Sequence, residues 1–273
     1  MNISLLTLVK NRKPAIINML AGLCKGNRFP SEVVIIHMNE QIYGLSGYPF
    51  PVREYVLSSV EALPLAHARN CAAQKALSDQ LVFLDADCIP AEDFLEVYQE
   101  ALYQKNCLYS GRVSYLPHWV MDKPDLLQLM ALSGTADPVR AGVDQYPYHL
   151  FWSLNFGCSK SVYAQIGGFD ETFCGYGAED TDFSFSARQK GVDLVTIDAM
   201  AYHQYHPSYD PPINHLEAIV KNAAIFNEKW GVWPMEGWLE KFCAMGYTAW
   251  QGGQLQILRL PGKDEISAVL KRS

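Results

Sequence analysis

The chain has 273 residues, of which 49% are hydrophobic and 19% are charged, and it carries a formal net charge of −7. This composition is typical of a globular protein with a large core, and the negative charge argues against nucleic acid as the main partner. The seven cysteines form no CxxC pair, which argues against a zinc site or disulfide frame and favours a reducing compartment. The chain has neither a basic leader nor an apolar run of roughly 18 residues. We therefore expect no transmembrane segment, and a location in the cytoplasm or peripherally at the inner face of a membrane.

Strands and helices are expected to alternate over the first hundred residues. Apolar runs predict strands over 3–9, 32–36 and 81–84, and a weaker pattern predicts a third strand over 52–57. Apolar residues at helical spacing predict a helix after Pro14, and an Ala-rich run predicts a second helix over 65–77. Such alternation implies right-handed βαβ units and a Rossmann-like, mostly parallel central sheet flanked by helices. We expect residues 1–105 to form a nucleotide-binding half, although neither GxGxxG nor a Walker P-loop is present.

Two carboxylates, Asp85 and Asp87, come directly after the predicted strand over 81–84. Ligands of open α/β sheets bind outside the carboxyl ends of the strands. Two hard oxygen ligands at that edge can hold a divalent cation where it meets a diphosphate. The alternative is that both acids are solvated residues of a turn, with Pro90 ending the strand and opening a helix over about 92–104.

Residues 106–206 are expected to form the second half of the same domain. Strands are predicted over 108–115, 151–158 and 192–197, and helices over 161–166 and 179–189. The segment 118–147 has no clear period and several prolines, which favours a substrate-facing insert or a flexible loop. Residues 207–273 are predicted to be a helical extension packed on this domain, with one amphipathic helix over 216–230.

A run of acids, which we call the acidic turn, occupies Gly175-Tyr176-Gly177-Ala178-Glu179-Asp180-Thr181-Asp182. Carboxylates in a first helical turn interact well with the helix dipole, so a capping role is one interpretation. The other interpretation is that one carboxylate serves as a general base for a hydroxyl group. Further along, His203 and His206 lie three residues apart, and either could give an imidazole to a cation held by the acid pair.

Taken together, these motifs resemble the family-2 glycosyltransferases of the GT-A fold. The resemblance covers about Ile3 to Pro207 and rests on Leu65-Ala66-His67-Ala68-Arg69-Asn70 and Phe83-Leu84-Asp85-Ala86-Asp87. The acidic turn, with Gly-Tyr-Gly-Ala-Glu-Asp, is similar to the C-terminal signature of metal-dependent galactosyltransferases and N-acetylgalactosaminyltransferases. The resemblance implies a GT-A domain over 1–206 that binds Mn²⁺ or Mg²⁺, a nucleotide-sugar, and a glycan or other hydroxyl acceptor.

On the donor side, the resemblance implies roles for three metal-site residues. Asp87 is expected to bind the metal directly, Asp85 to face the metal or the ribose, and His203 to complete the site, with His206 as its substitute. Further contacts to the nucleotide are expected from Thr7, Val9, Arg12, Asn39, Arg69 and Ala86. Many relatives have two aspartates after the second strand, one of which contacts uracil, but this chain has His37-Met38 there.

The resemblance also implies catalytic and substrate-binding roles for residues of the acidic turn. Asp180 stands where relatives have the catalytic base, and Glu179 stands where an acid binds donor or acceptor hydroxyls. Tyr176 stands where relatives often have a Trp that packs against the sugar, and Tyr176 and Gly177 are both expected to bind the substrate. Retaining relatives commonly have Asn in place of the base, so Asp180 favours inversion. The expected function is metal-dependent, inverting transfer of a hexose or N-acetylhexosamine from a UDP-sugar to an acceptor hydroxyl.

Two other functions remain open from the residues alone. A nucleotidyltransferase of similar α/β architecture would use paired acids and a metal, but it should have a Gly-rich basic loop after its first strand. The segment Lys10-Asn11-Arg12-Lys13 is basic but contains no glycine. A catalytically inactive nucleotide- or sugar-binding module is the third possibility, and the retained Asp85, Asp87, Asp180 and His203 argue against it.

Overall fold

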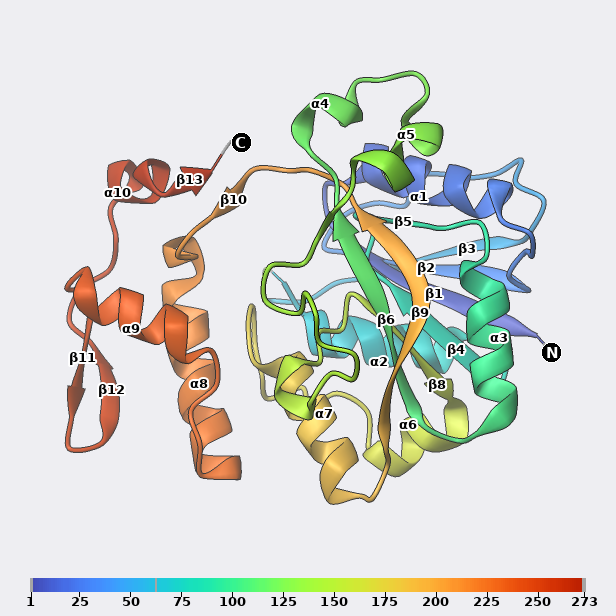
Figure 1. Cartoon of the computed structure of the whole chain (residues 1–273). Coiled ribbons are helices and arrows are strands. Elements are labelled where there is room, and N and C mark those ends of the chain that lie inside the picture. The colour runs from blue at the N-terminus through green and yellow to red at the C-terminus, as the bar shows by residue number, and fades with distance from the viewer. Residues whose placement is uncertain (1, 62, 272–273) are drawn as a thin grey trace.

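A computed structural model describes residues 2–61 and 63–271, and its centre is a twisted sheet (Figure 1). The strands of this sheet are β1 (Ile3–Val9), β2 (Glu32–Met38), β3 (Val52–Leu57), β4 (Gln80–Leu84), β5 (Cys88–Pro90), β6 (Leu108–Tyr115), β7 (Thr135–Ala136), β8 (Asn155–Ser159) and β9 (Leu194–His203). Their order is β3-β2-β1-β4-β8-β6-β9-β5, with β7 paired to β6. The parallel arrangement predicted for the first half is confirmed for β3, β2, β1 and β4. The second half is mixed, because β8 runs antiparallel to both β4 and β6, whereas β6 and β9 are parallel.

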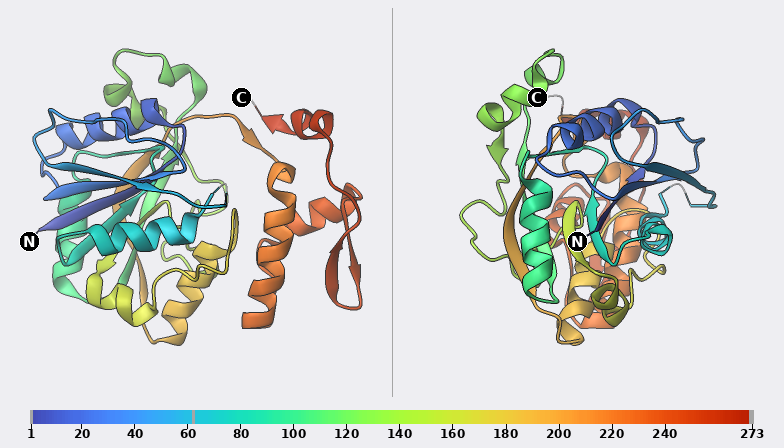
Figure 2. Two further views of the ribbon diagram at one scale, coloured as in Figure 1. Left: turned by 180° about the vertical axis from the view of Figure 1, so that it is seen from behind. Right: turned by 90° about the vertical axis from the view of Figure 1, so that its right-hand side faces the viewer.

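Helices cover both faces of the sheet (Figures 1 and 2). One face carries α1 (Lys13–Lys25) and α3 (Phe94–Gln104), and the other carries α2 (Leu65–Lys75), α6 (Lys160–Ile166) and α7 (Glu179–Gln189). Leu5 and Val9 of β1 pack in the first core, and Leu6 and Leu8 pack in the second. Both faces of β1 are therefore apolar, which explains why a central strand appears in the sequence as an unbroken apolar run.

Several predicted boundaries near the ends of strands are wrong. Strand β2 continues to Met38, so His37 and Met38 lie inside the strand rather than after it. Pro90 ends β5 instead of opening a helix, and α3 begins only at Phe94. The aromatic strand predicted from 151 begins at Asn155. At these boundaries, pairing with neighbouring strands, rather than local composition, decides where a strand begins or ends.

Strand β9 extends beyond its predicted end at 197 and carries His203 as its last residue. It pairs with β6 on both sides of an irregularity between Ser110 and Arg112. A side chain at the intervening Gly111 would collide with Asn155 and with the carbonyl of Ala199, so glycine is required at this close approach. The bulge lets the pairing resume, and it carries the strand as far as the residues of the candidate site.

The insert 118–147 is folded rather than a flexible loop in its first part. It forms α4 (His118–Met121) and α5 (Leu126–Ser133), followed by β7. Val120, Leu126 and Met130 form a small core with Ile89 of β5. Burial of these apolar side chains on the end of the sheet is what orders the segment.

The described part of the C-terminal extension, residues 207–271, lies beside the α7 end of the molecule (Figure 1). Its elements are β10 (Ser208–Tyr209), the 3-10 helix η2 (Ile213–His215), α8 (Leu216–Trp230), α9 (Glu236–Ala244), β11 (Thr248–Gln251), β12 (Gln254–Ile257), α10 (Lys263–Ala268) and β13 (Leu270–Lys271); a second 3-10 helix, η1, spans Tyr148–Leu150. The β11–β12 hairpin and the β10–β13 pair were not expected from the sequence pattern. Phe226 of α8 packs with Phe173 and with Phe185 of α7, which joins the extension to the sheet domain. No helix in the described part of the chain is long and apolar enough to cross a membrane.

Candidate active site

A cavity of about 680 Å³, the active-site cavity, lies at the carboxyl ends of β1, β4 and β9. The predicted site residues that line it are Val9, Arg12, Arg69, Asp85, Ala86, Asp87, Tyr176, Gly177, Glu179, Asp180 and His203. Segments as distant in sequence as β1 and the acidic turn therefore meet at one place, as expected for the edge of an open α/β sheet.

Two predicted nucleotide contacts, Thr7 and Asn39, do not line this cavity. Thr7 is buried inside β1, and its hydroxyl has no hydrogen-bond partner among the residues that the structure describes. Asn39 has a φ of 55° and binds the loop after β3, donating to the Glu61 carbonyl at 2.6 Å and accepting from the Ser59 amide at 2.7 Å. In this structure Asn39 shapes a loop instead of facing the cavity.

His37, at the position where relatives have an aspartate, is fully buried between two carboxylates. Its Nε2 lies 2.9 Å from Glu54 Oε2, and its Nδ1 lies 3.4 Å from Glu40 Oε1. Glu40 also accepts a hydrogen bond from the Tyr43 hydroxyl at 2.6 Å and one from the Asn11 amide at 2.7 Å. The departure from the family pattern therefore forms a polar network that fastens the turn after β1.

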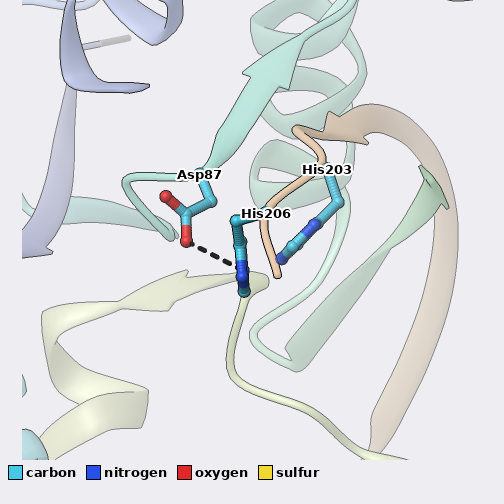
Figure 3. A group of neighbouring side chains, drawn as sticks. All are labelled: Asp87, His203 and His206. Carbon is cyan, nitrogen blue, oxygen red and sulfur yellow. Dashed lines mark ion pairs between the residues drawn. The ribbon is translucent and has the colours of Figure 1, made fainter. Parts of the chain in front are cut away.

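Asp87, His203 and His206, which we call the metal group, converge on one another (Figure 3), and the first two line the cavity. One ligand atom from each residue lies within 4.8 Å of the others, and Asp87 Oδ2 is 3.4 Å from His206 Nε2. Antiparallel pairing sets Cys88 of β5 opposite His203, and the Gln204 amide donates to the Asp87 carbonyl at 2.7 Å. The backbone of the sheet thus fixes both sides of the metal group.

The metal group fits a divalent cation. Asp87 Oδ1 is buried and has no hydrogen-bond partner within the described ranges, so a strong acceptor is left for a ligand. Burial lowers the pKa of His203 to about 4, which keeps its imidazole neutral and able to coordinate. One carboxylate and two imidazoles suit Mn²⁺ better than Mg²⁺, which prefers oxygen ligands. The alternative histidine, His206, accompanies His203 here instead of replacing it.

Asp85 lies outside the metal group and faces Arg69, with 3.9 Å between its Oδ1 and Arg69 Nη2. Burial, with a smaller contribution from Asp87, raises the pKa of Asp85 to about 6, although Arg69 opposes the shift. Arg69 itself is buried on α2 and donates from Nη1 to Glu179 Oε1 at 3.1 Å. This guanidinium consequently connects the acid pair after β4 to the acidic turn.

The three acids of the turn have different partners. Glu179 accepts from Arg69 and from the Gly177 amide, the latter at 3.1 Å. Asp182, with a side chain 1% exposed, accepts from Lys229 Nζ at 3.0 Å and from Trp230 Nε1 at 2.7 Å. Both carboxylates therefore have protein partners, although Glu179 also lines the active-site cavity.

Asp180 differs because its Oδ1 accepts from the Thr181 amide at 2.7 Å, within its own turn, while the side chain lines the cavity. Over the described ranges it forms no ion pair. Burial raises its pKa to about 7, and the charge of Glu179 adds to the shift. A carboxylate with a pKa near neutrality and a face toward a cavity is suited to accept a proton.

The C-terminal extension contributes residues that sequence reasoning missed. Met235 and Trp238 line the active-site cavity. Tyr176 stacks on Trp238, with 6.2 Å between ring centroids. Asn222 of α8 is fully buried, and its Nδ2 lies 3.0 Å from the Cys174 carbonyl and 2.9 Å from the Gly177 carbonyl. The only signal for Asn222 in the sequence is an amide on the apolar face of an amphipathic helix.

Comparisons with known proteins agree with this geometry. Residues 50–167 match the family described as Glycosyl transferase family 2, and residues 141–209 match that described as N-terminal domain of galactosyltransferase. No curated protein matches the sequence significantly.

Solved structures match over most of this chain. S. aureus TarS 1–349 in complex with UDP is 15% identical with a TM-score of 0.56, over 83% of this chain and 66% of that one. TarS 1–349 in complex with UDP-GlcNAc is 14% identical with a TM-score of 0.57, over 88% and 76%. GalNAc-T7 with UDP, GalNAc and Mn²⁺ is 14% identical with a TM-score of 0.56, over 89% and 57%.

These identities are low, so the structural matches establish the fold alone. The chain spans less than two thirds of the first TarS structures, at 66%, and 40% of a longer TarS chain. Two glycosyltransferase family models, each covering less than half of the chain, match it over residues 50–167 and 141–209, and its fold is that of the GT-A glycosyltransferases.

Proposed function

We propose that this protein is a metal-dependent, inverting glycosyltransferase that moves a hexose or N-acetylhexosamine from a UDP-sugar to an acceptor hydroxyl. The observation that carries the proposal is that one cavity contains both the metal-group residues Asp87 and His203 and the carboxylate of Asp180, which forms no ion pair with the described residues. The similar structures of TarS with UDP-GlcNAc, and of GalNAc-T7 with UDP and Mn²⁺, support the donor class and the metal.

Asp87, His203 and His206 would hold Mn²⁺ through one carboxylate oxygen and two imidazole nitrogens. When bound, a divalent cation stabilises the negative charge that develops on a leaving diphosphate. Arg12 adds a positive charge at the same side of the cavity, because its Nη1 lies 3.5 Å from Asp87 Oδ2. Asp85 and Arg69 form the adjoining wall and would contact the ribose or the donor sugar.

Asp180 would take the proton from the acceptor hydroxyl as that oxygen attacks the anomeric carbon. The new carbon–oxygen bond forms while the bond from the anomeric carbon to the diphosphate oxygen breaks, and UDP leaves with the electron pair. A single displacement of this kind inverts the anomeric configuration. Glu179, held by Arg69 and the Gly177 amide, keeps the turn in the conformation that presents Asp180.

The test is UDP release from UDP-Glc, UDP-Gal, UDP-GlcNAc and UDP-GalNAc with Mn²⁺, with Mg²⁺ and with a chelator. We expect at least one donor to be turned over, with Mn²⁺ preferred and with loss of activity in Asp87→Ala. Asp79→Ala, at an exposed acid outside the cavity, is the matched control. Equal, metal-independent UDP release by wild type and Asp87→Ala would contradict the proposal. Formation of pyrophosphate from a nucleoside triphosphate and a sugar phosphate would instead identify a nucleotidyltransferase.

A further inference from the structure

A second cavity of about 330 Å³, the outer cavity, adjoins the active-site cavity. Leu63 and Tyr176 line both of them, so the two spaces meet at the acidic turn. The remaining walls of the outer cavity come from η2, the first residues of α8 and the segment 260–266. Its volume falls within the range of about 300–1,000 Å³ that is common for small-molecule sites.

The outer cavity contains polar groups that lack protein partners or remain accessible. Asn214 Oδ1 is a buried atom without a hydrogen-bond partner among the described residues, and Asn214 lines the cavity. His215 stacks on Tyr176 with 4.7 Å between ring centroids and an interplanar angle of 21°. Burial lowers the pKa of His215, so its ring is neutral near pH 7. A buried acceptor without a partner is rare in folded proteins and is satisfied when a ligand donates to it.

The charge of the lining restricts what the outer cavity can hold. Its described lining includes no Lys or Arg, and Glu217 is its one acidic residue. A phosphate or carboxylate group would find no cation there, whereas a neutral polyol can donate hydroxyls to Asn214 and pack on aromatic and aliphatic side chains. This chemistry matches a neutral sugar ring.

We infer that the outer cavity binds the second sugar of the acceptor, the residue next to the one that is glycosylated. This inference rests on the proposed function, because it assigns an acceptor that only a glycosyltransferase uses. The acceptor hydroxyl lies beside Asp180 in the active-site cavity, and the neighbouring ring lies beyond Tyr176 against Asn214. The enzyme then discriminates in favour of acceptors with at least two neutral sugars, and the C-terminal extension provides that selectivity.

The experiment compares kcat/KM for matched pairs of neutral acceptors: methyl glucoside with methyl cellobioside, methyl galactoside with methyl lactoside, and methyl N-acetylglucosaminide with methyl chitobioside. We expect a disaccharide of at least one pair to exceed its monosaccharide by about tenfold. Asn214→Leu removes the acceptor atom at similar volume and should lower that ratio by about threefold to tenfold, as for one neutral hydrogen bond. Leu260→Trp, at an exposed position on the cavity wall, should lower the ratio by obstruction.

Asn227→Leu, on α8 but lining neither cavity, is the control and should keep the wild-type ratio. Donor turnover without acceptor separates the two proposals. If wild type turns over no UDP-sugar, the proposed function fails and the inference fails with it. If donor turnover is present but each pair reacts equally, or if both cavity variants keep the wild-type ratio, only the second-sugar site is overturned. If kcat/KM rises only from methyl to octyl glycosides, and not from monosaccharides to disaccharides, the cavity binds an apolar aglycone and the second-sugar site is likewise overturned.

Discussion

The two sides of the active-site cavity are built in different ways. The metal group is held by the backbone of the sheet, since β5 pairs with β9 and the Gln204 amide binds the Asp87 carbonyl. Among the described residues, the acidic turn has one isolated bridge, between Gly175 and Pro64, and no other strand partner. It is held mainly by side chains, above all by Asn222 from α8.

Glycines make this second arrangement possible. Gly175 and Gly177 have φ values of 81° and 100°, in the left-handed region that favours glycine. A side chain at Gly175 would come within 3.0 Å of Ala218 Cβ, and one at Gly177 within 3.0 Å of Met235 Sδ. The geometry of the metal group therefore depends on the sheet domain, whereas the position of Asp180 depends on the C-terminal extension. Changes on one side should therefore leave the other largely intact.

The largest expected effect separates chemistry from donor binding. Asp180→Asn keeps the shape of the side chain and removes the base, so transfer should fall by about 10²–10⁴-fold. Affinity for UDP with Mn²⁺, measured by calorimetry, should stay close to that of wild type. Glu179→Gln and Asp182→Asn serve as comparisons in the same turn. Wild-type transfer by Asp180→Asn together with loss in Glu179→Gln would assign the base to Glu179.

A second change acts on the sheet side. Asp87→Ala leaves two imidazoles without the carboxylate, and we expect Mn²⁺-dependent UDP affinity to fall by more than about 100-fold, beyond the loss typical of outer-shell changes. Calorimetry with and without Mn²⁺ measures the effect, and Asp79→Ala provides the control. In a complex with Mn²⁺ and UDP, both His203 and His206 should lie about 2.0–2.3 Å from the ion. Unchanged affinity in the variant would remove Asp87 from the metal site.

A third change tests the role of the extension. Asn222→Leu leaves buried carbonyls of the acidic turn without a donor, which should cost about 1–3 kcal/mol of stability. Because the turn carries Asp180, kcat for transfer should fall by about 10- to 100-fold through misplacement. UDP–Mn²⁺ affinity should change little, and Asn227→Leu should change neither quantity. Equal losses in donor affinity and kcat would show that the two sides are not independent.

The smallest effect concerns pH. With a pKa of about 7, Asp180 is protonated below neutrality, so the transfer rate should fall about tenfold per pH unit on the acid side. The rate profile of Asp180→Asn should lack this limb. In metal-free buffer, Asp180 stays protonated in the folded state between pH 3.8, its usual pKa, and about pH 7, whereas in the unfolded state it is ionised there. The stability that Asp180 contributes therefore declines as the pH rises through that window. Asp180→Asn should therefore raise the melting temperature at pH 8 more than at pH 4, as measured by calorimetry.

Much of the fold could be predicted because it depends on local patterns. The apolar run of β1, the amphipathic period of α8 and the acidic start of α7 gave their boundaries directly, and the weaker pattern of β3 was also placed correctly. The sheet edge could also be predicted, since carboxylates after a buried strand indicate a ligand-binding position. Strand pairing could not be predicted. For that reason the predicted end of β9 at residue 197 lies too early, and Pro90 was predicted to open a helix although it ends β5.

The contiguous motifs made Asp87, His203 and Asp180 candidates for metal binding and base catalysis, and the resemblance to glycosyltransferases selected them among neighbouring acids and histidines. Only the tertiary structure decided which neighbours they have. Arg69 and Glu179 meet although they are 110 positions apart, and Asp182 is occupied by Lys229, which is 47 positions away. The physical reason is that a carboxylate acts as base, ligand or structural anchor according to the charges and donors packed around it. Those partners are brought by other strands and helices, which no local sequence pattern specifies.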